Sequence, residues 1–331
     1  MMPSSLRQRD SAAESSHLNC DHLYGWNGFG RRDPAAVAKA SMPVTPMSTE
    51  SVSAPHSGAE LPRISIVVPT RNQAATIADT IVSILGQNYP HCEIIVVDGG
   101  SEDDTLNVLD RYRSELALLI SEPDRGQSDA INKGFAQASG DLLCWLNSDD
   151  YLLPGALWRV AAAFRADPDL ELLVGCGDVI SFDHQFLRHI PALELNEHTL
   201  LNWKNDRWIM QQCCFWTHAL WRRVGGVDER LHLLMDYDLW FRFGRATRTA
   251  LLGEKLAVMR YYPDAKTVRE KANVYREYAY VYAKNGCLDA LDQHIASLLA
   301  ERTQTHRYLE RIDASLPVRL LKRLSLFPSP A

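Results

Sequence analysis

The segment 142–150 reads L-L-C-W-L-N-S-D-D and divides sharply into an apolar half and a polar half. Its five apolar residues have the length and composition of a buried strand. Its polar end falls where an α/β sheet binds ligands, beyond the carboxyl ends of the strands. The adjacent carboxylates of Asp149 and Asp150 are hard oxygen ligands of the kind that Mg²⁺ or Mn²⁺ prefers. A polar turn that merely caps the strand is the alternative interpretation.

Three similar units precede this segment. Apolar runs at 64–68, 93–97 and 116–120 predict strands, and each is followed by a polar loop. Between the first two runs, residues 77–85 repeat apolar side chains at helical spacing. Strand and helix thus alternate about every 25 to 30 residues, which predicts an α/β fold with a parallel sheet and right-handed crossovers. The polar strand ends would then share one edge of the sheet, with Asn72, Asp98, Asp124 and Asp149 in chain order.

Two common phosphate-binding loops are missing from the sequence. Neither Gly-x-Gly-x-x-Gly nor Gly-x-x-x-x-Gly-Lys-Ser/Thr follows the first strand, so dinucleotide and P-loop sites lack their phosphate cradle. Asp98 could accept hydrogen bonds from a ribose hydroxyl or a base N–H. Asp149 with a divalent metal could neutralise a diphosphate, because a bound metal acts as a Lewis acid on the leaving group. The absence of these loops and the presence of the two carboxylates favour nucleotide-diphosphate chemistry over hydride transfer.

Composition excludes several other classes. The chain of 331 residues carries a net charge of −6, which gives no basis for general nucleic-acid binding. Its seven cysteines show no Cys-x-x-Cys spacing, and several lie in apolar runs, as expected for reduced thiols in a cytoplasmic protein. The sequence has no basic-then-apolar signal pattern and no run of 18 apolar residues, so we expect no built-in transport across or through a membrane.

Five motifs occur in order between residues 63 and 268. They read I-S-I-V-V-P-T-R-N, I-I-V-V-D-G-G-S-x-D-x-T, E-P-D-R-G-Q-S-D-A-I-N-K-G, W-L-N-S-D-D-Y-L-L-P-G-A and M-D-Y-D-L-W-F-R. In wording, order and spacing this stretch resembles the family 2 glycosyltransferases of the GT-A fold. The similarity covers roughly 205 of 331 residues and leaves both ends of the chain unexplained. It implies a Rossmann-like, mostly parallel sheet flanked by helices.

The resemblance also implies a donor site. Pro69, Thr70 and Asn72 would border the nucleotide, and Asp98 would hold its base or ribose. The residues expected near the sugar and diphosphate are Asp124, Gln127, Asp129, Asn132, Asn147 and Ser148.

A divalent metal, Mn²⁺ or Mg²⁺, is the cofactor that the resemblance implies, with Asp149 as its ligand. Asn147 replaces the first Asp of the family's Asp-x-Asp motif and is uncharged. Tyr262 stands where many similar proteins have a His, and a neutral phenol is a poorer metal ligand. Binding of the donor phosphates would therefore depend more on Asp149, Lys266 or Thr267.

The second half would face the acceptor. Gln211 and Trp216 are candidate acceptor contacts, although Trp216 fits equally well in the core. The resemblance makes Asp236 the catalytic base that takes the proton of an acceptor hydroxyl, with Asp238 as second choice. Asp236 also begins a predicted helix, where a carboxylate can serve simply as an N-cap.

These patterns predict three regions. Residues 1–61 form a disordered or extended segment, and 62–268 form the glycosyltransferase domain, with a nucleotide half (62–150) and an acceptor half (151–268). Residues 269–331 form a helical C-terminal extension. Its basic, amphipathic stretch at 302–327 predicts either docking on its own domain or peripheral contact with the inner face of a membrane.

The sequence therefore predicts an inverting, metal-dependent glycosyltransferase. It would move a sugar from a nucleotide-diphosphate donor, UDP-linked in our prediction, to a saccharide or lipid-linked acceptor in surface polysaccharide synthesis. A catalytically silent nucleotide-sugar-binding or scaffold protein is the alternative. A sugar nucleotidyltransferase is disfavoured, because its Gly-rich, basic loop is absent after the first strand.

Overall fold

The computed structural model describes residues 60–202, 208–262 and 266–314, apart from some side chains of the C-terminal helices. The segment predicted to be disordered or extended, 1–61, lies almost entirely outside these residues. The part of the predicted membrane contact beyond residue 314 lies outside them as well.

The first half builds a parallel sheet, as predicted. Its strands and helices are β1 (Ile64–Thr70), α1 (Ile77–Leu85), β2 (Cys92–Asp98), α2 (Thr105–Leu109), the 3-10 helix η3 (Asp110–Tyr112), β3 (Leu118–Ser121), α3 (Gln127–Gln137) and β4 (Leu142–Trp145). The parallel strands lie in the order β3-β2-β1-β4. β3 begins two residues later than its apolar run, because Leu116 and Ala117 still belong to the turn that enters it.

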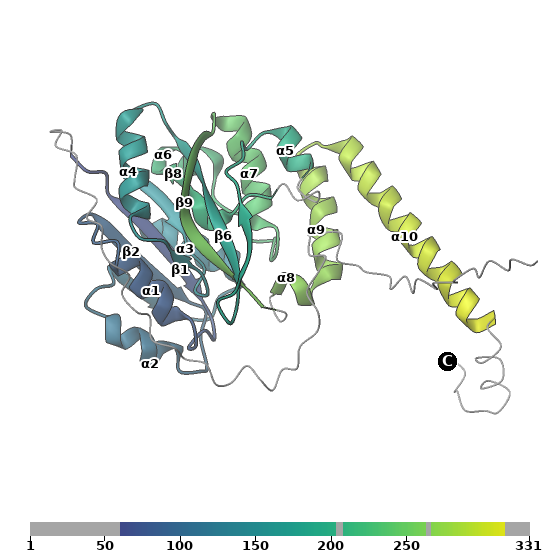
Figure 1. The fold of residues 1–331 in the computed structure, drawn as a ribbon, viewed down its shortest axis with the longest axis horizontal. Helices are drawn as coiled ribbons and strands as arrows, with labels where there is room; N and C mark the ends of the chain where they lie inside the picture. The colour runs from purple at the N-terminus through teal and green to yellow at the C-terminus, as the bar shows by residue number, and fades with distance from the viewer. Residues whose placement is uncertain (1–59, 203–207, 263–265, 315–331) are drawn as a thin grey trace, which may run out of the picture.

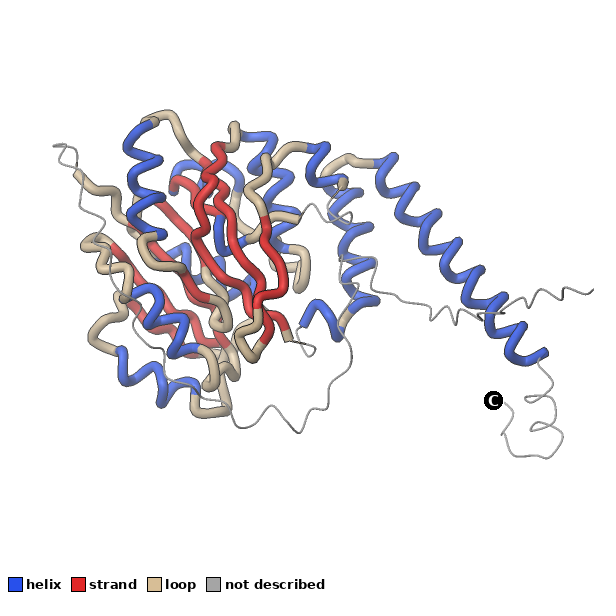
Figure 2. The backbone as a smooth tube through the Cα atoms, in the orientation of Figure 1, coloured by secondary structure: helices blue, strands red, loops and turns tan. Residues whose placement is uncertain are grey.

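The second half extends the same sheet with mixed pairing. It contains β5 (Tyr151–Leu152), α4 (Ala156–Ala166), β6 (Leu172–Ser181), β7 (Phe186–Ile190), α5 (Glu197–Leu201), the 3-10 helix η4 (Gln211–Cys213), β8 (Cys214–Thr217), α6 (His218–Val224), α7 (Met235–Ala246) and β9 (Ala250–Tyr261). β8 is antiparallel to β4 and β6, whereas β9 is parallel to β6 and antiparallel to β5. We did not anticipate β9, whose charged residues and largely exposed first half give no strand periodicity. Within the described residues the sheet has nine strands, which are drawn in red in Figure 2.

Two hydrophobic cores lie on opposite faces of this sheet. Ile66 and Val68 of β1 pack with α1 and α4, whereas Val67 faces α3, α6 and α7. Burial on both faces explains why the parallel strands are apolar runs rather than alternating ones. The two cores hold the strands in place, and the ends of those strands position the site.

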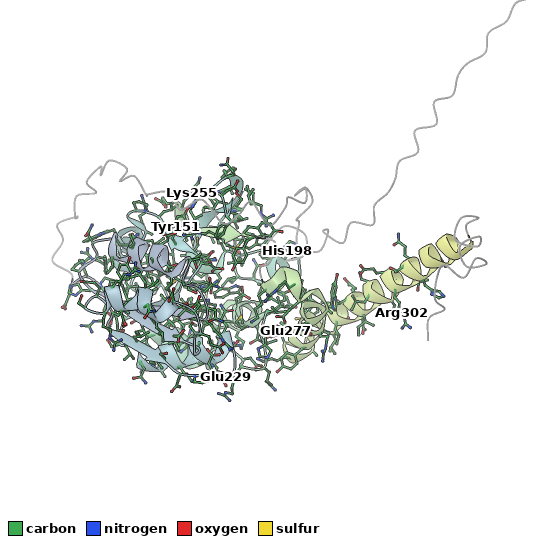
Figure 3. All side chains as sticks on the ribbon, turned by 90° about the horizontal axis from the view of Figure 1, so that it is seen from below. Tyr151, His198, Glu229, Lys255, Glu277 and Arg302 are labelled. Atoms are coloured by element: carbon green, nitrogen blue, oxygen red, sulfur yellow. The ribbon has the colours of Figure 1, made fainter. Side chains whose placement is uncertain are left out.

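Three helices follow the sheet: α8 (Lys266–Arg269), α9 (Lys271–Lys284) and α10 (Leu288–Ala314). Val274, Tyr278 and Val281 of α9 are buried in the core that contains α7. α10 projects away from the body, as Figures 1 and 3 show, with Arg302 on the projecting part. The predicted helical extension is confirmed, and its first long helix is packed against the α/β domain. None of the helices within the described ranges is both long and apolar enough to cross a membrane.

Candidate functional site

A cavity of about 810 Å³ lies at the edge of the sheet where β1 and β4 end. Segments that are far apart in the sequence meet around it. They lie within 69–73, 124–130, 145–150, 208–212, 232–236, 259–262 and 266–270. The predicted convergence of polar strand ends is therefore present, and it forms a hollow large enough for a sizeable ligand.

The loop after β1 forms one wall. Pro69, Thr70 and Asn72 all line the cavity, where the sequence placed them. Asn72 adopts a left-handed backbone conformation (φ 54°), and its side-chain oxygen accepts a hydrogen bond from the Glu102 N–H (2.8 Å). The hydroxyl of Thr70 is buried and has no hydrogen-bond partner in the structure. A buried polar group without a partner is unfavourable, so this hydroxyl is suited to bind a ligand in the cavity.

The loop after β4 forms the adjacent wall. Asn147 accepts a hydrogen bond from Gln127 (2.8 Å) and donates one to Asp150 (3.2 Å), which ties the α3 and β4 loops together. Asp149 accepts a hydrogen bond of 2.6 Å from the hydroxyl of Tyr262. Burial raises the pKa of Asp149, which shows how poorly water solvates this carboxylate. A cation would compensate for that loss of solvation.

Asp150 has a different environment from its neighbour. It is 1% exposed and accepts hydrogen bonds from the Gln212 side chain and from the Arg260 N–H (3.1 Å). Burial, reinforced by the nearby Asp149, raises its pKa well above the usual range. The carboxyl group of Asp150 therefore links the β4 loop to β9 and has a structural role.

Asp236 lines the cavity from the first turn of α7. Burial raises its pKa to about 6, and the charge of Glu277 adds to the increase. A carboxylate with a pKa in this range is ionised at neutral pH and still basic enough to accept a proton. The residue thus has the properties required of the predicted base.

Three predicted donor residues do not line the cavity. Asp98 is fully buried and accepts hydrogen bonds from Ser101 and from the Ser121 hydroxyl (2.8 Å), so its carboxylate organises the loop after β2. Asp129 pairs with Arg125 (2.9 Å), whose hydrogen bond lowers the pKa of Asp129 to about 2. The remaining residue, Asn132, binds the backbone of Val227 through both ends of its amide. In this structure, all three stabilise the walls of the site and do not face it.

The structure also corrects the roles predicted for Asp238 and Trp216. Asp238 is fully buried and pairs with Arg242 (2.9 Å) and Lys284 (2.8 Å), away from the cavity. Because Asp238 lies two residues after Asp236 on helix α7, its side chain points in a different direction, into the core. Trp216 is fully buried against Trp145 and Trp240, which corresponds to the packing interpretation.

The other predicted residues do reach the cavity. They are Asp124, Gln127, Asn147, Ser148, Asp149 and Gln211. Gln211 donates to the carbonyl of Trp145 (2.7 Å), and its own side-chain oxygen is buried without a partner. This oxygen is a second unpaired polar atom beside the cavity.

Several cavity residues were not predicted from the sequence. They are Gln73, Trp208, Gln212, His232, Arg260, Arg269 and Glu270. Arg260 is 6% exposed and pairs with Asp79 (2.7 Å). A basic residue within a mainly apolar strand was the one available signal for Arg260. The loop residues have no such signal, because only the tertiary fold brings them to this edge.

No group of three or more His, Cys, Asp or Glu side chains could hold a metal ion by itself within the described ranges. Asp149 is the one ionisable carboxylate of the β4 loop that faces the cavity without being tied into the core. Mg²⁺ commonly binds through one or two carboxylates together with substrate phosphates. The donor set here therefore fits a metal that the substrate helps to coordinate.

Comparison with known proteins identifies the fold and the family. The model of Glycosyl transferase family 2 matches residues 65–224. A PGL/p-HBAD biosynthesis glycosyltransferase of Mycobacterium bovis is 33% identical over 184 residues, which cover 55% of this chain and 69% of the relative. The chain belongs to glycosyltransferase family 2. An uncharacterized glycosyltransferase of Rickettsia typhi is 27% identical over 76% of this family 2 enzyme and 79% of its own length.

Solved structures agree with this family 2 glycosyltransferase in fold. TarS 1-349 of S. aureus, in complex with UDP-GlcNAc, has a TM-score of 0.55 at 19% identity, over 67% of this chain and 66% of that chain. The mannosyltransferase PcManGT of Pyrobaculum calidifontis, in complex with GDP-Man and Mn²⁺, has a TM-score of 0.52 at 19% identity, over 79% and 83%. The GT-A-like fold predicted from the sequence is thus confirmed.

Proposed function

We propose that this family 2 enzyme is an inverting, metal-dependent glycosyltransferase that uses a nucleotide-diphosphate sugar. The proposal rests chiefly on one arrangement: Asp149 and Asp236 line the same cavity from two different elements, β4's loop and the start of α7. The first would face the leaving diphosphate, and the second would face the acceptor hydroxyl. Because the two tasks need carboxylates in different environments, their separation supports a division of roles.

The donor would lie along the loops after β1 and β4. The hydroxyl of Thr70 and the side-chain oxygen of Gln211 lack partners in the described structure and would bind polar groups of the donor. Lys266 lines the cavity and would supply a positive charge near the phosphates. We favour UDP as the nucleotide. The structural neighbours have been solved with UDP-GlcNAc and with GDP-Man. GDP-sugars are therefore the donors to test against UDP-sugars.

Transfer would occur by direct displacement at the anomeric carbon. The acceptor oxygen forms a bond to that carbon while the bond from the carbon to the diphosphate oxygen breaks. The bonding electrons leave with the diphosphate, and the acceptor proton passes to the carboxylate of Asp236. Attack opposite the leaving group inverts the configuration. With its pKa near 6, Asp236 is ionised and ready to accept the proton at neutral pH.

Asp149 would hold Mn²⁺ or Mg²⁺ together with the donor phosphates, and Asn147 would contribute only a neutral side chain. The bound metal would neutralise charge on the leaving diphosphate. The hydroxyl of Tyr262 would fix the orientation of the Asp149 carboxylate through its 2.6 Å hydrogen bond. This contact gives Tyr262 a role in the site without requiring it to bind the metal.

We propose a saccharide or lipid-linked acceptor in the synthesis of a surface polysaccharide or glycolipid. Relatives in Mycobacterium are named for PGL/p-HBAD biosynthesis. Action in the cytoplasm, with contact at the inner face of a membrane through residues 302–327, belongs to the same proposal. The basic residues Arg302 and Arg307 on α10 support such contact, because anionic lipid surfaces attract them.

Nucleotide release tests the proposal directly. Purified full-length protein is incubated with Mn²⁺ and each of a panel of UDP- and GDP-sugars, and the free nucleotide is measured with and without saccharide and lipid-linked acceptors. We expect turnover with one donor, loss of turnover on adding EDTA, and recovery with Mn²⁺. Asp149→Ala and Asp236→Asn should each lower the rate by at least about 100-fold.

Asp289→Asn provides the matched control, because it removes a carboxylate from an exposed position on α10. It should retain the rate of the unaltered enzyme. Tight nucleotide binding without turnover on any donor and acceptor would contradict the proposed reaction. Full activity in Asp236→Asn would contradict the role given to that carboxylate.

A further inference from the structure

Glu277 on α9 binds three consecutive backbone N–H groups of the segment before α7. Its carboxylate accepts hydrogen bonds from His232 (2.8 Å), Leu233 (2.9 Å) and Leu234 (2.8 Å). Asp236 follows this anchored segment after one residue and is the second residue of α7. In Figure 3, Glu277 is labelled on the part of the molecule next to the projecting helix α10. One carboxylate from the C-terminal helices thus fixes the backbone that carries the proposed base.

The contact solves a local problem at the start of α7. The first N–H groups of a helix have no partners within it and are normally capped by a nearby side chain. Leu234, at the N-cap position, has no polar side chain that could do so, and no side-chain cap bond forms there. Within the first turn, the carboxylate of Asp236 itself accepts from the Tyr237 N–H (2.7 Å). Glu277, on a different helix, accepts from the N–H groups of Leu234 and of the two residues before it. Its negative charge also interacts favourably with the positive end of the α7 dipole.

A second contact from the same region holds this segment. The ammonium group of Lys266, on α8, donates a hydrogen bond of 2.6 Å to the carbonyl of His232. Glu277 and Lys266 therefore secure the N–H groups and one carbonyl of the same short stretch. Both lie outside residues 65–224, the part matched by the family model.

We propose that Glu277 is a positioning residue for the transfer reaction, placing Asp236 at the acceptor from the C-terminal extension. The inference rests on the proposed role of Asp236. It assigns to α9 a share in the active site.

The charges near Asp236 give this contact a measurable consequence. His232, Lys266, Arg269 and Glu270 line the same cavity as Asp236, and the thiol of Cys214 on β8 interacts electrostatically with Asp236. Among charged side chains, Glu277 is the one whose electrostatic effect raises the pKa of Asp236, in addition to burial. Removing the charge of Glu277 should therefore lower that pKa.

Two variants separate position from charge. Glu277→Gln keeps the length of the side chain and removes its charge, whereas Glu277→Asp keeps the charge and shortens the reach by one methylene. For each, the rate of nucleotide release is measured against pH from 4.5 to 9, together with KM for the donor. Thermal unfolding and nucleotide binding are measured in parallel to show that the proteins are folded.

We expect Glu277→Gln to lower kcat by about tenfold and to leave the donor KM within about twofold. Because Asp236 must be ionised to act as a base, the acid limb of its kcat profile should move to lower pH. Glu277→Asp should also lower kcat, but with its acid limb near that of the unaltered enzyme. A purely structural effect would lower kcat without this difference between the two profiles.

The matched control is Glu301→Gln, at an exposed position of α10. Its profile should coincide with that of the unaltered enzyme. Unchanged kcat and acid limb in both Glu277 variants would overturn the inference while the proposed reaction remains intact. Absence of turnover in the unaltered enzyme, or full activity in Asp236→Asn, would instead contradict the proposed function itself.

Discussion

The hydroxyl of Tyr262 lies 2.6 Å from the Asp149 carboxylate and donates a hydrogen bond to it. Tyr262 stands on the segment that leaves β9, and Asp149 on the loop after β4, so the contact joins the two halves of the domain. A partner of this kind orients a metal-binding carboxylate even when it does not touch the metal.

Replacing Tyr262 with Phe removes only this hydroxyl. We expect the Mn²⁺ concentration needed for half-maximal activity to rise by about 10- to 100-fold, the usual effect of losing such a partner. The measurement is a metal titration of nucleotide release. Tyr280→Phe is the control, because its hydroxyl binds Asp228 (2.9 Å) and Tyr280 does not line the cavity. An unchanged titration would show that Tyr262 has no part in arranging the site.

Replacement by alanine should lower stability at Asp150 and activity at Asp149. Asp150→Ala leaves the buried donors of Gln212, Arg260 and Asn147 without their acceptor, so we expect a loss of about 2 to 4 kcal/mol in unfolding free energy. Asp149→Ala removes a poorly solvated carboxylate and should abolish turnover with little loss of stability. Urea unfolding and nucleotide release on both variants check the contrast. Equal destabilisation would argue against separate roles.

The raised pKa of Asp236 predicts a stability that depends on pH. Its folded-state pKa of about 6 lies above the ordinary value of 3.8, so the folded protein binds more protons between these values. Stability from this group is therefore present below about pH 4 and is lost as pH rises through 6. Asp236→Asn, which cannot ionise, should unfold at a higher temperature than the unaltered enzyme at pH 8. The advantage is on the order of 3 kcal/mol, the equivalent of this pKa difference.

Thermal unfolding at pH 4, 6 and 8 measures this difference. The gap between the two proteins should grow with pH and nearly close at pH 4. A gap that is constant across the range would show that the carboxyl of Asp236 titrates normally.

Asp238, two residues along the same helix, should behave as a structural residue. Its carboxylate is fully buried between Arg242 (2.9 Å) and Lys284 (2.8 Å). Asp238→Ala leaves both cations without their buried partner and should cost about 3 to 5 kcal/mol in unfolding free energy. Urea unfolding measures the loss. A stable Asp238→Ala protein that is specifically inactive would restore Asp238 as a candidate base.

Thr70→Val tests the unpaired hydroxyl in the cavity. Because this buried hydroxyl has no partner within the described structure, its removal should leave the unfolding free energy unchanged or raise it. If the donor uses the hydroxyl, its KM should rise by about fivefold, the equivalent of one ordinary hydrogen bond. Steady-state kinetics and thermal unfolding give both values. An unchanged KM would mean that the hydroxyl faces no part of the donor.

Patterns local to the chain were enough to predict the parallel part of the sheet. The apolar runs of β1, β2 and β4 are largely buried on both faces, and such strands can be recognised because most of their positions are apolar. β9 was not predicted, since it pairs with β5 and β6 through the backbone, while its charged residues Lys255 and Arg260 pair with Asp178 and Asp79. Its place depends on partners far away in the sequence.

The site, like the sheet, was predicted only in part from the sequence. The sequence by itself determined which loops meet at the carboxyl edge of a parallel sheet, and hence that residues 69–72 and 147–149 line one cavity. Only the tertiary structure decided which carboxylates face that cavity. Asp98, Asp129 and Asp238 instead bind partners in loops and helices, because a buried polar or charged group needs a partner.

The tertiary structure also decided the contribution of the C-terminal helices. Nothing local in the sequence of α9 marks Glu277 as different from an exposed glutamate on any amphipathic helix. It acquires its proposed role because packing of Val274, Tyr278 and Val281 in the core brings its carboxylate to the N–H groups before α7. A sequence specifies the chemistry of each side chain, whereas the direction in which a carboxylate faces depends on what the fold packs around it.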